Sequence, residues 1–135
     1  MCSWSLSNIR KLLQTRWLFG VLALLWAALT FWLSSSPDAQ GVGGFLDLRP
    51  PFDKLYHAVN FGVLAALLYL ATGRAWLAVL LASLYGVSDE LHQSFVPGRS
   101  SDVTDWLADT AGAFLAVLVV RYVLRCWVKG KASTR

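Results

Sequence analysis

The chain has 135 residues, of which 56% are hydrophobic and only 15% are charged, so it has room for a single domain over residues 1–135. Its mean hydropathy of +0.52 is too high for a soluble domain of this size and is typical of membrane proteins. The net charge of +4 does not call for a nucleic-acid partner, because the basic residues lie beside apolar stretches, where membrane topology accounts for them.

The first apolar stretch covers residues 17–33 without a charged residue, and it follows the basic side chains of Arg10, Lys11 and Arg16. The serines at 34–36 leave open a signal peptide that is cleaved after this stretch. However, the stretch is longer than the roughly 7–15 apolar residues usual in a signal peptide. We therefore favour an uncleaved first transmembrane helix.

Residues 34–53 are rich in proline and glycine and are predicted to form a loop. Residues 55–72 are predicted to form the second span, which is interrupted only by His57 and Asn60. The two residues that follow, Gly73 and Arg74, form such a short link that the next helix must run back antiparallel to the second.

The third span is predicted over residues 75–95, but its apolar part ends at residue 88. At 1.5 Å per residue this part covers only about 21 Å of a roughly 30 Å hydrocarbon core. Asp89, Glu90 and Gln93 must therefore lie within or close to the membrane. The Pro-Gly pair at 97–98 is expected to end the helix.

A fourth span is predicted over residues 103–121, where Ser101 or Asp102 can cap the N-terminus of the helix. The expected fold is thus an all-α, integral membrane four-helix bundle. Nine of the twelve basic residues lie on the cytoplasmic side if both the N-terminus and the C-terminus are cytoplasmic, as the positive-inside rule favours. We expect a multi-pass protein of the bacterial cytoplasmic (inner) membrane.

All eight acidic residues and both histidines fall in the outer half of this topology. On three helices the polar residues are spaced by three or four positions, which places them on one helix face. Ionisable groups inside a membrane normally turn inward and find partners, so we predict one polar pocket that faces outward. The candidate binding residues are Asp53, Lys54, His57, Asn60, Asp89, Glu90, Gln93, Arg99, Asp102, Asp105 and Asp109.

Four of these residues, His57, Asp89, Glu90 and Asp109, are also candidates for a catalytic role, since a histidine among acids suits proton transfer. The same group would suit a divalent cation, although the spacing matches no standard zinc motif such as H-E-x-x-H. No cofactor is otherwise evident. Cys2 and Cys126 have no metal-binding spacing.

Simpler explanations stay open for several of these residues. Asp53 can cap the second helix, and Asp102 with Asp105 can cap the fourth. Lys54 can extend towards the membrane interface, and Arg99 can pair with Asp102. The small residues along the last three helices are attributed to helix packing alone.

The chain resembles the VanZ-like family of small bacterial membrane proteins over about residues 53–112, in the segments D-K-L-Y-H-A-V-N-F and D-E-L-H-Q-S-F-V-P-G-R-S-S-D-V-T-D-W-L-A-D-T-A-G. The resemblance implies a cell-envelope role, because the founding member is linked to teicoplanin resistance, but it implies no reaction. Many members carry Asn where this chain has Asp109, so a negative charge at that position is not implied. In the second segment the match rests on Asp89, Glu90, Gln93, Phe95, Arg99, Asp102, Asp105 and Gly112.

Several functions stay open. We favour the binding of a cell-envelope precursor or another polar headgroup at the outward-facing pocket, in a protein whose other partners are membrane lipids. The alternatives are a membrane enzyme that acts on a lipid-linked phosphate by acid–base or metal chemistry, a proton or cation pathway, and a structural scaffold. Against a pathway, the inner half of the bundle is apolar apart from a few hydroxyl groups. The sequence does not indicate an oligomeric state.

Overall fold

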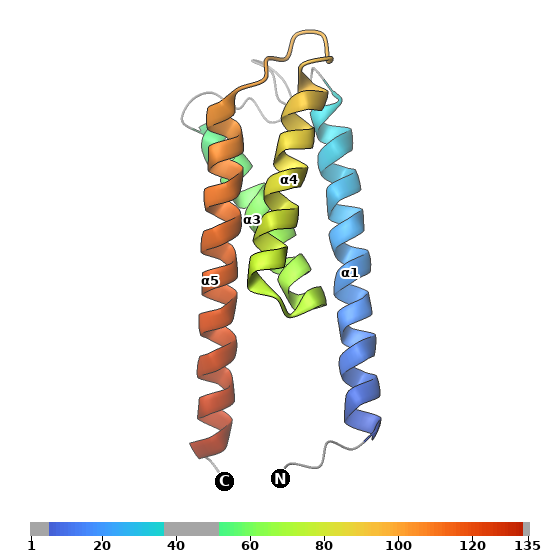
Figure 1. The fold of residues 1–135 in the computed structure, drawn as a ribbon, viewed down its shortest axis with the longest axis vertical. Coiled ribbons are helices and arrows are strands. Elements are labelled where there is room, and N and C mark those ends of the chain that lie inside the picture. The colour runs from blue at the N-terminus through green and yellow to red at the C-terminus, as the bar shows by residue number, and fades with distance from the viewer. Residues whose placement is uncertain (1–5, 37–51, 134–135) are drawn as a thin grey trace.

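The computed structural model describes residues 6–36 and 52–133, and these residues form four α-helices. The helices are α1 (Leu6–Ser34), α3 (Phe52–Thr72), α4 (Ala75–Gln93) and α5 (Val103–Ser133). Figure 1 shows them side by side, with the first residues of α1 and the last residues of α5 at the same end of the bundle. The prediction of an all-α fold with four helices is confirmed.

The predicted spans at 17–33, 55–72 and 103–121 agree within a few residues with the apolar segments of the structure, but the first and last helices are longer than their spans. α1 begins at Leu6 rather than near residue 17, and α5 continues to Ser133 rather than ending near residue 121. Lysine and arginine end a membrane span but are good helix formers, so each helix continues where its apolar stretch stops. The predicted loop at 34–53 lies largely outside the described residues, and Cys2 lies outside them too.

Among the described residues, three segments are long and apolar enough to cross a membrane: Thr15–Ser34, Phe52–Thr72 and Val103–Cys126. The helix α4 is not one of them, because its last turns carry Asp89 and Glu90. It contacts α1, α3 and α5, and Figure 1 shows it between α1 and α5, in front of α3. The helix α4 thus packs within the bundle, and the predicted third membrane span at residues 75–95 is not supported by length and hydropathy.

The turn between α3 and α4 is as tight as predicted. Gly73 has a φ of 71°, a conformation that favours glycine, and its N–H donates to the Tyr69 carbonyl oxygen at 2.8 Å. The chain reverses here, so α4 runs back to the end of the bundle where α3 and α5 begin (Figure 1). The turn thereby brings the polar end of α4 to the polar ends of the other two helices.

Small residues allow α3 and α5 to pack closely. A Cβ atom built on Gly112 would lie 2.6 Å from the Cα atom of Ala58, so the two backbones meet at this point. Large apolar side chains such as Leu24 and Trp32 point outward, as expected of helices that face acyl chains. The buried hydrophobic residues are Ala23, Phe61, Leu64, Ala65, Ala78, Ala82, Ala113 and Val117.

Candidate functional site

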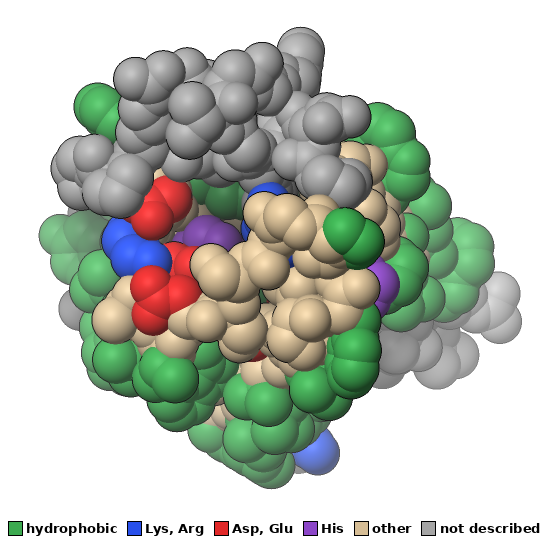
Figure 2. Space-filling model, turned by 90° about the horizontal axis from the view of Figure 1, so that it is seen from above, with side chains coloured by type: hydrophobic (Ala, Val, Ile, Leu, Met, Phe, Trp, Pro, Cys, Tyr) green, Lys and Arg blue, Asp and Glu red, His purple; other side chains and the backbone are tan. Residues whose placement is uncertain are grey.

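Charged side chains gather at the end of the bundle where α3 and α5 begin and α4 ends. Figure 2 looks onto this end and shows acidic, basic and histidine side chains close to one another. Because α4 runs antiparallel to α3 and α5, its last residues lie beside the first residues of these two helices. The residues joined here by hydrogen bonds or ion pairs are Asp53, Lys54, His57, Glu90, Asp102, Asp105 and Asp109.

Lys54, in the first turn of α3, lies at the centre of the outer part of this cluster. Its Nζ atom is 3.0 Å from Asp102 Oδ2 and 3.4 Å from Asp53 Oδ2, and it also donates to Asp105 Oδ1. These three carboxylates come from α3, from the loop before α5 and from α5 itself. Lys54 therefore joins three parts of the chain and does not simply extend to the membrane interface.

Asp102 acts both as a helix cap and as a partner of Lys54. Its Oδ1 atom accepts the Thr104 N–H at 2.8 Å, and its carbonyl oxygen accepts the Asp105 N–H at 2.9 Å. Of the two capping residues that the sequence left open, Ser101 and Asp102, it is Asp102 that caps α5. The hydrogen bond from the Thr104 backbone, followed by the one from Lys54, lowers the pKa of Asp102 to about 2.

Replacing Lys54 with methionine is expected to raise the pKa of Asp102 part of the way towards its ordinary value. The substitution removes the Lys54 hydrogen bond, which is one of the two main causes of the low pKa. Since folding lowers this pKa, ionised Asp102 stabilises the fold above the unfolded-state value of about 3.9, and this contribution is lost as the pH falls towards 2. Carbon-13 NMR of the labelled carboxyl group in detergent micelles measures both pKa values. An unchanged pKa in Lys54→Met would contradict the ion pair.

His57 and Asp109 form the inner part of the cluster. The Nδ1 atom of His57 lies 2.9 Å from Asp109 Oδ1, and Asp109 has no exposed surface. Because an ionised carboxylate only accepts hydrogen bonds, Nδ1 carries the proton and donates it. The other oxygen of Asp109 has no hydrogen-bond partner in the described part of the chain and lies against α4, where a Cβ atom on Gly86 would be 2.9 Å away.

Glu90 connects α4 to the loop that precedes α5. Its Oε2 atom accepts the Asp102 N–H at 2.7 Å, while its Oε1 atom is buried without a hydrogen-bond partner among the described residues. One ligand atom of Glu90 lies within 4.8 Å of one ligand atom each of His57 and Asp105. In the described part of the chain, these three residues are close enough together to hold a metal ion.

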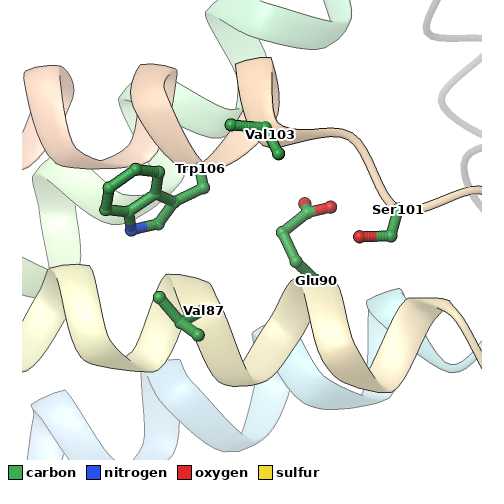
Figure 3. A pocket seen from close by; sticks show the side chains of 5 residues that line it. All are labelled: Val87, Glu90, Ser101, Val103 and Trp106. Atoms are coloured by element: carbon green, nitrogen blue, oxygen red, sulfur yellow. The ribbon is translucent and has the colours of Figure 1, made fainter.

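A cavity of about 250 Å³ opens next to Glu90, between α4 and α5. Val87, Val103 and Trp106 form its apolar walls, and Glu90 and Ser101 form its polar end (Figure 3). The sequence did not single out Val87, Val103 or Trp106 as site residues, because apolar side chains in a membrane span carry no distinguishing signal. Gly86 was attributed to packing alone, although its missing side chain makes room for Asp109.

Not all predicted residues join this cluster. Asn60 turns towards α1, where its side chain exchanges hydrogen bonds with Thr30 at 3.1 and 3.2 Å. The prediction had assigned no polar contact to α1, although Thr30 is a polar residue within an otherwise apolar stretch. Asp89 accepts a hydrogen bond from Gln93 at 3.0 Å within α4.

Arg99 has no ion-pair partner within the part of the chain that the structure describes. The suggested pair between Arg99 and Asp102 is absent there, since Asp102 instead pairs with Lys54. Arg99 lies in the loop between α4 and α5, where its N–H donates to the Val96 carbonyl oxygen at 3.1 Å. Within the described residues this backbone hydrogen bond is the contact that holds Arg99 in the loop.

Three helices long and apolar enough to cross a membrane, in a bundle with buried ionisable groups at one end, indicate a membrane protein. A family model described as VanZ/LLP1 matches residues 11–125 of this chain. The match covers most of the sequence and all four helices in part or whole, and the chain belongs to the VanZ/LLP1 family. No match was found among curated proteins or among solved structures.

Proposed function

We propose that this chain binds the polar headgroup of a lipid-linked cell-envelope molecule at the outer surface of the bacterial cytoplasmic membrane. In this proposal both chain ends are cytoplasmic, and the cluster around His57 and Glu90 faces outward. The charge pattern supports the orientation, since most basic residues lie at the opposite end of the bundle. The observation that carries the proposal is the cavity between α4 and α5.

The cavity has the two surfaces that an amphiphile needs. Val87 and Val103 expose 49% and 68% of their surface, so the apolar walls are accessible from the hydrocarbon region beside the helices. The carboxylate of Glu90 forms the polar end, next to His57 and Asp105. Apolar walls with a few convergent polar groups are typical of sites that bind small molecules. A lipid would place its acyl part along Val87 and its headgroup at Glu90.

The charge of the cluster restricts the headgroup. Asp53, Asp102 and Asp105 surround the single ammonium group of Lys54, and Glu90 adds a further acid. An anionic group would therefore be repelled unless a cation accompanies it. The ligand must bring an amine or bind together with a metal ion.

Filling the cavity is expected to prevent lipid binding. In Val87→Trp the indole would occupy the space between α4 and α5, so the amount of lipid retained by the purified protein should fall at least tenfold. Leu84→Trp is a matched control, because Leu84 lies on the same helix, is 56% exposed and does not line the cavity. Native mass spectrometry from detergent measures the retained lipid and identifies it by mass. Equal retention in both variants would contradict the proposal.

The role in the cell is tested through a deletion strain. Sensitivity to envelope stress, including glycopeptide antibiotics, is the phenotype to measure, because the proposed ligand is an envelope molecule. The wild-type gene and Leu84→Trp are expected to restore growth, whereas Val87→Trp and Glu90→Gln are not. Full restoration by Glu90→Gln, correctly inserted, would mean that the acidic end of the cavity has no role in that function.

A second candidate function, hydrolysis or group transfer on a lipid-linked phosphate, is favoured by one observation. Asp109 holds Nδ1 of His57 at 2.9 Å and so leaves Nε2 as the basic atom, an arrangement that orients a general base. Release of phosphate from a lipid-linked pyrophosphate by purified protein, abolished in His57→Ala, would support an enzyme. Binding without turnover would support the headgroup-binding function alone.

A further inference from the structure

The geometry points to a divalent transition-metal site formed by His57, Glu90 and Asp105. Each of these residues comes from a different helix, and all three are buried, with exposed fractions of 5%, 6% and 9%. One ligand atom from each lies within 4.8 Å of the other two. This site goes beyond the proposed headgroup binding, and the contacts that indicate it do not depend on the identity of any lipid.

Each of the three residues has one polar atom held by a neighbour and a second one without a hydrogen bond to any described residue. His57 uses Nδ1 for Asp109, Asp105 uses Oδ1 for Lys54, and Glu90 uses Oε2 for the Asp102 N–H. The atom left over on His57, Nε2, lies 3.9 Å from the one left over on Asp105, Oδ2, which is too far for a hydrogen bond. The remaining atom of Glu90, Oε1, is buried and has no hydrogen-bond partner within residues 6–36 and 52–133, although the Ser101 side chain lines the same cavity.

In metal sites, too, a ligand residue binds the ion with one polar atom while a neighbouring group holds its other polar atom. A ligating histidine usually donates its other N–H to a carboxylate, which fixes the ring and makes the free nitrogen more basic. Asp109 does this for His57, and Lys54 and the Asp102 backbone hold the two carboxylates. Asp109 is thus a positioning residue that acts through His57.

A bound cation explains why the Glu90 carboxylate is buried, whereas protonation of His57 alone does not. If His57 were simply protonated, it would bond Asp109 and attract Asp105, but Oε1 of Glu90 would remain buried without a partner, which is unfavourable. An ion between the three residues gives Glu90 Oε1 and Asp105 Oδ2 a shared partner. Its two positive charges would offset those of Glu90 and Asp105, which Lys54, shared with Asp53 and Asp102, does not neutralise.

The ligand atoms select the kind of ion. Mg²⁺ and Ca²⁺ prefer oxygen ligands alone, whereas an imidazole with two carboxylates suits Zn²⁺ and related first-row ions. Ligand distances of about 2.0–2.2 Å for Zn²⁺ require the three side chains to close in by small rotations. Three protein ligands leave a position open on the ion, where a headgroup oxygen can bind.

The test uses full-length protein purified without a histidine tag, stripped with a chelator and titrated with Zn²⁺ and with Co²⁺. We expect about one ion per chain and a visible Co²⁺ absorption band. His57→Ala, and Glu90→Gln with its preserved shape, should weaken binding at least tenfold. His92→Ala is the control, because His92 is on α4 but packs against Phe31, with the ring centroids 4.4 Å apart, and contacts Ser35, outside the cluster. It should bind the ion as wild type does.

Asp109→Asn tests the positioning role. The thermal midpoint should stay close to that of wild type, and the Co²⁺ band should shift. The affinity for the ion should fall by about tenfold, at the low end of the effect of removing a hydrogen-bond partner of a metal ligand. Wild-type protein that binds no ion, or that binds equally in His57→Ala, would overturn the site whatever the variants' stability. If Val87→Trp loses lipid but keeps the ion, the metal site stands on its own. If the ion is absent while lipid binding is intact, only the metal site fails.

Discussion

Replacing Gly112 with alanine is expected to lower the free energy of unfolding by about 3 kcal/mol, at the upper end of the range for overpacked helix contacts. The added Cβ atom would lie 2.6 Å from the Cα atom of Ala58 and closer still to its carbonyl oxygen. These are backbone atoms, so no side-chain rotation relieves the overlap. α3 and α5 would have to separate, which also moves His57 away from Asp109. Thermal unfolding in detergent, followed by circular dichroism, measures the loss.

Two other glycines provide matched controls for this prediction. Gly20 on α1 has no atom within 4 Å of an added Cβ, whereas at Gly62 the nearest atom is the Gly112 carbonyl oxygen at 3.3 Å. Gly20→Ala should therefore leave stability unchanged or slightly raised, and Gly62→Ala should give an intermediate loss. If Gly112→Ala unfolds at the same temperature as Gly20→Ala, the close contact between α3 and α5 does not exist.

The sequence predicted the existence and order of the helices well, for a simple physical reason. Apolar stretches of membrane length and a two-residue turn leave few other folds open. The ends of α1 and α5 were missed because hydropathy reports where a span stops and not where a helix stops. The part of α1 before residue 17 and the part of α5 after residue 121 carry charged residues but no proline, so nothing in them ends a helix.

The prediction of the site depended on spacing along each helix. His57, Asp105 and Asp109 lie on facing sides of α3 and α5, as the intervals of four residues suggested. Asn60 follows His57 by three residues and is rotated by roughly 60° from it. This rotation is enough to turn Asn60 towards Thr30 on α1. A periodic pattern gives the face of a helix but not the neighbour that covers it.

Removing His57 is expected to cost about 3–5 kcal/mol of stability, the usual penalty when a buried charge loses its partner. The carboxylate of Asp109 is fully buried, and its Oδ2 atom already lacks a hydrogen bond from any residue that the structure describes. In His57→Ala the Oδ1 atom would lose its partner as well, so an ionised group would remain in the bundle without compensation. Unfolding by a graded denaturing detergent, monitored through tryptophan fluorescence, measures the change.

The neighbouring variants separate the loss of the pair from the loss of volume. Asp109→Asn keeps an oxygen that accepts the His57 N–H, so it should lose less than about 1 kcal/mol. His57→Ala combined with Asp109→Ala should be more stable than His57→Ala alone, because no buried charge is left without a partner even though the cavity is larger. Additive losses in the double variant would show that the two side chains are not coupled. The 2.9 Å contact between them would then contribute nothing to the fold.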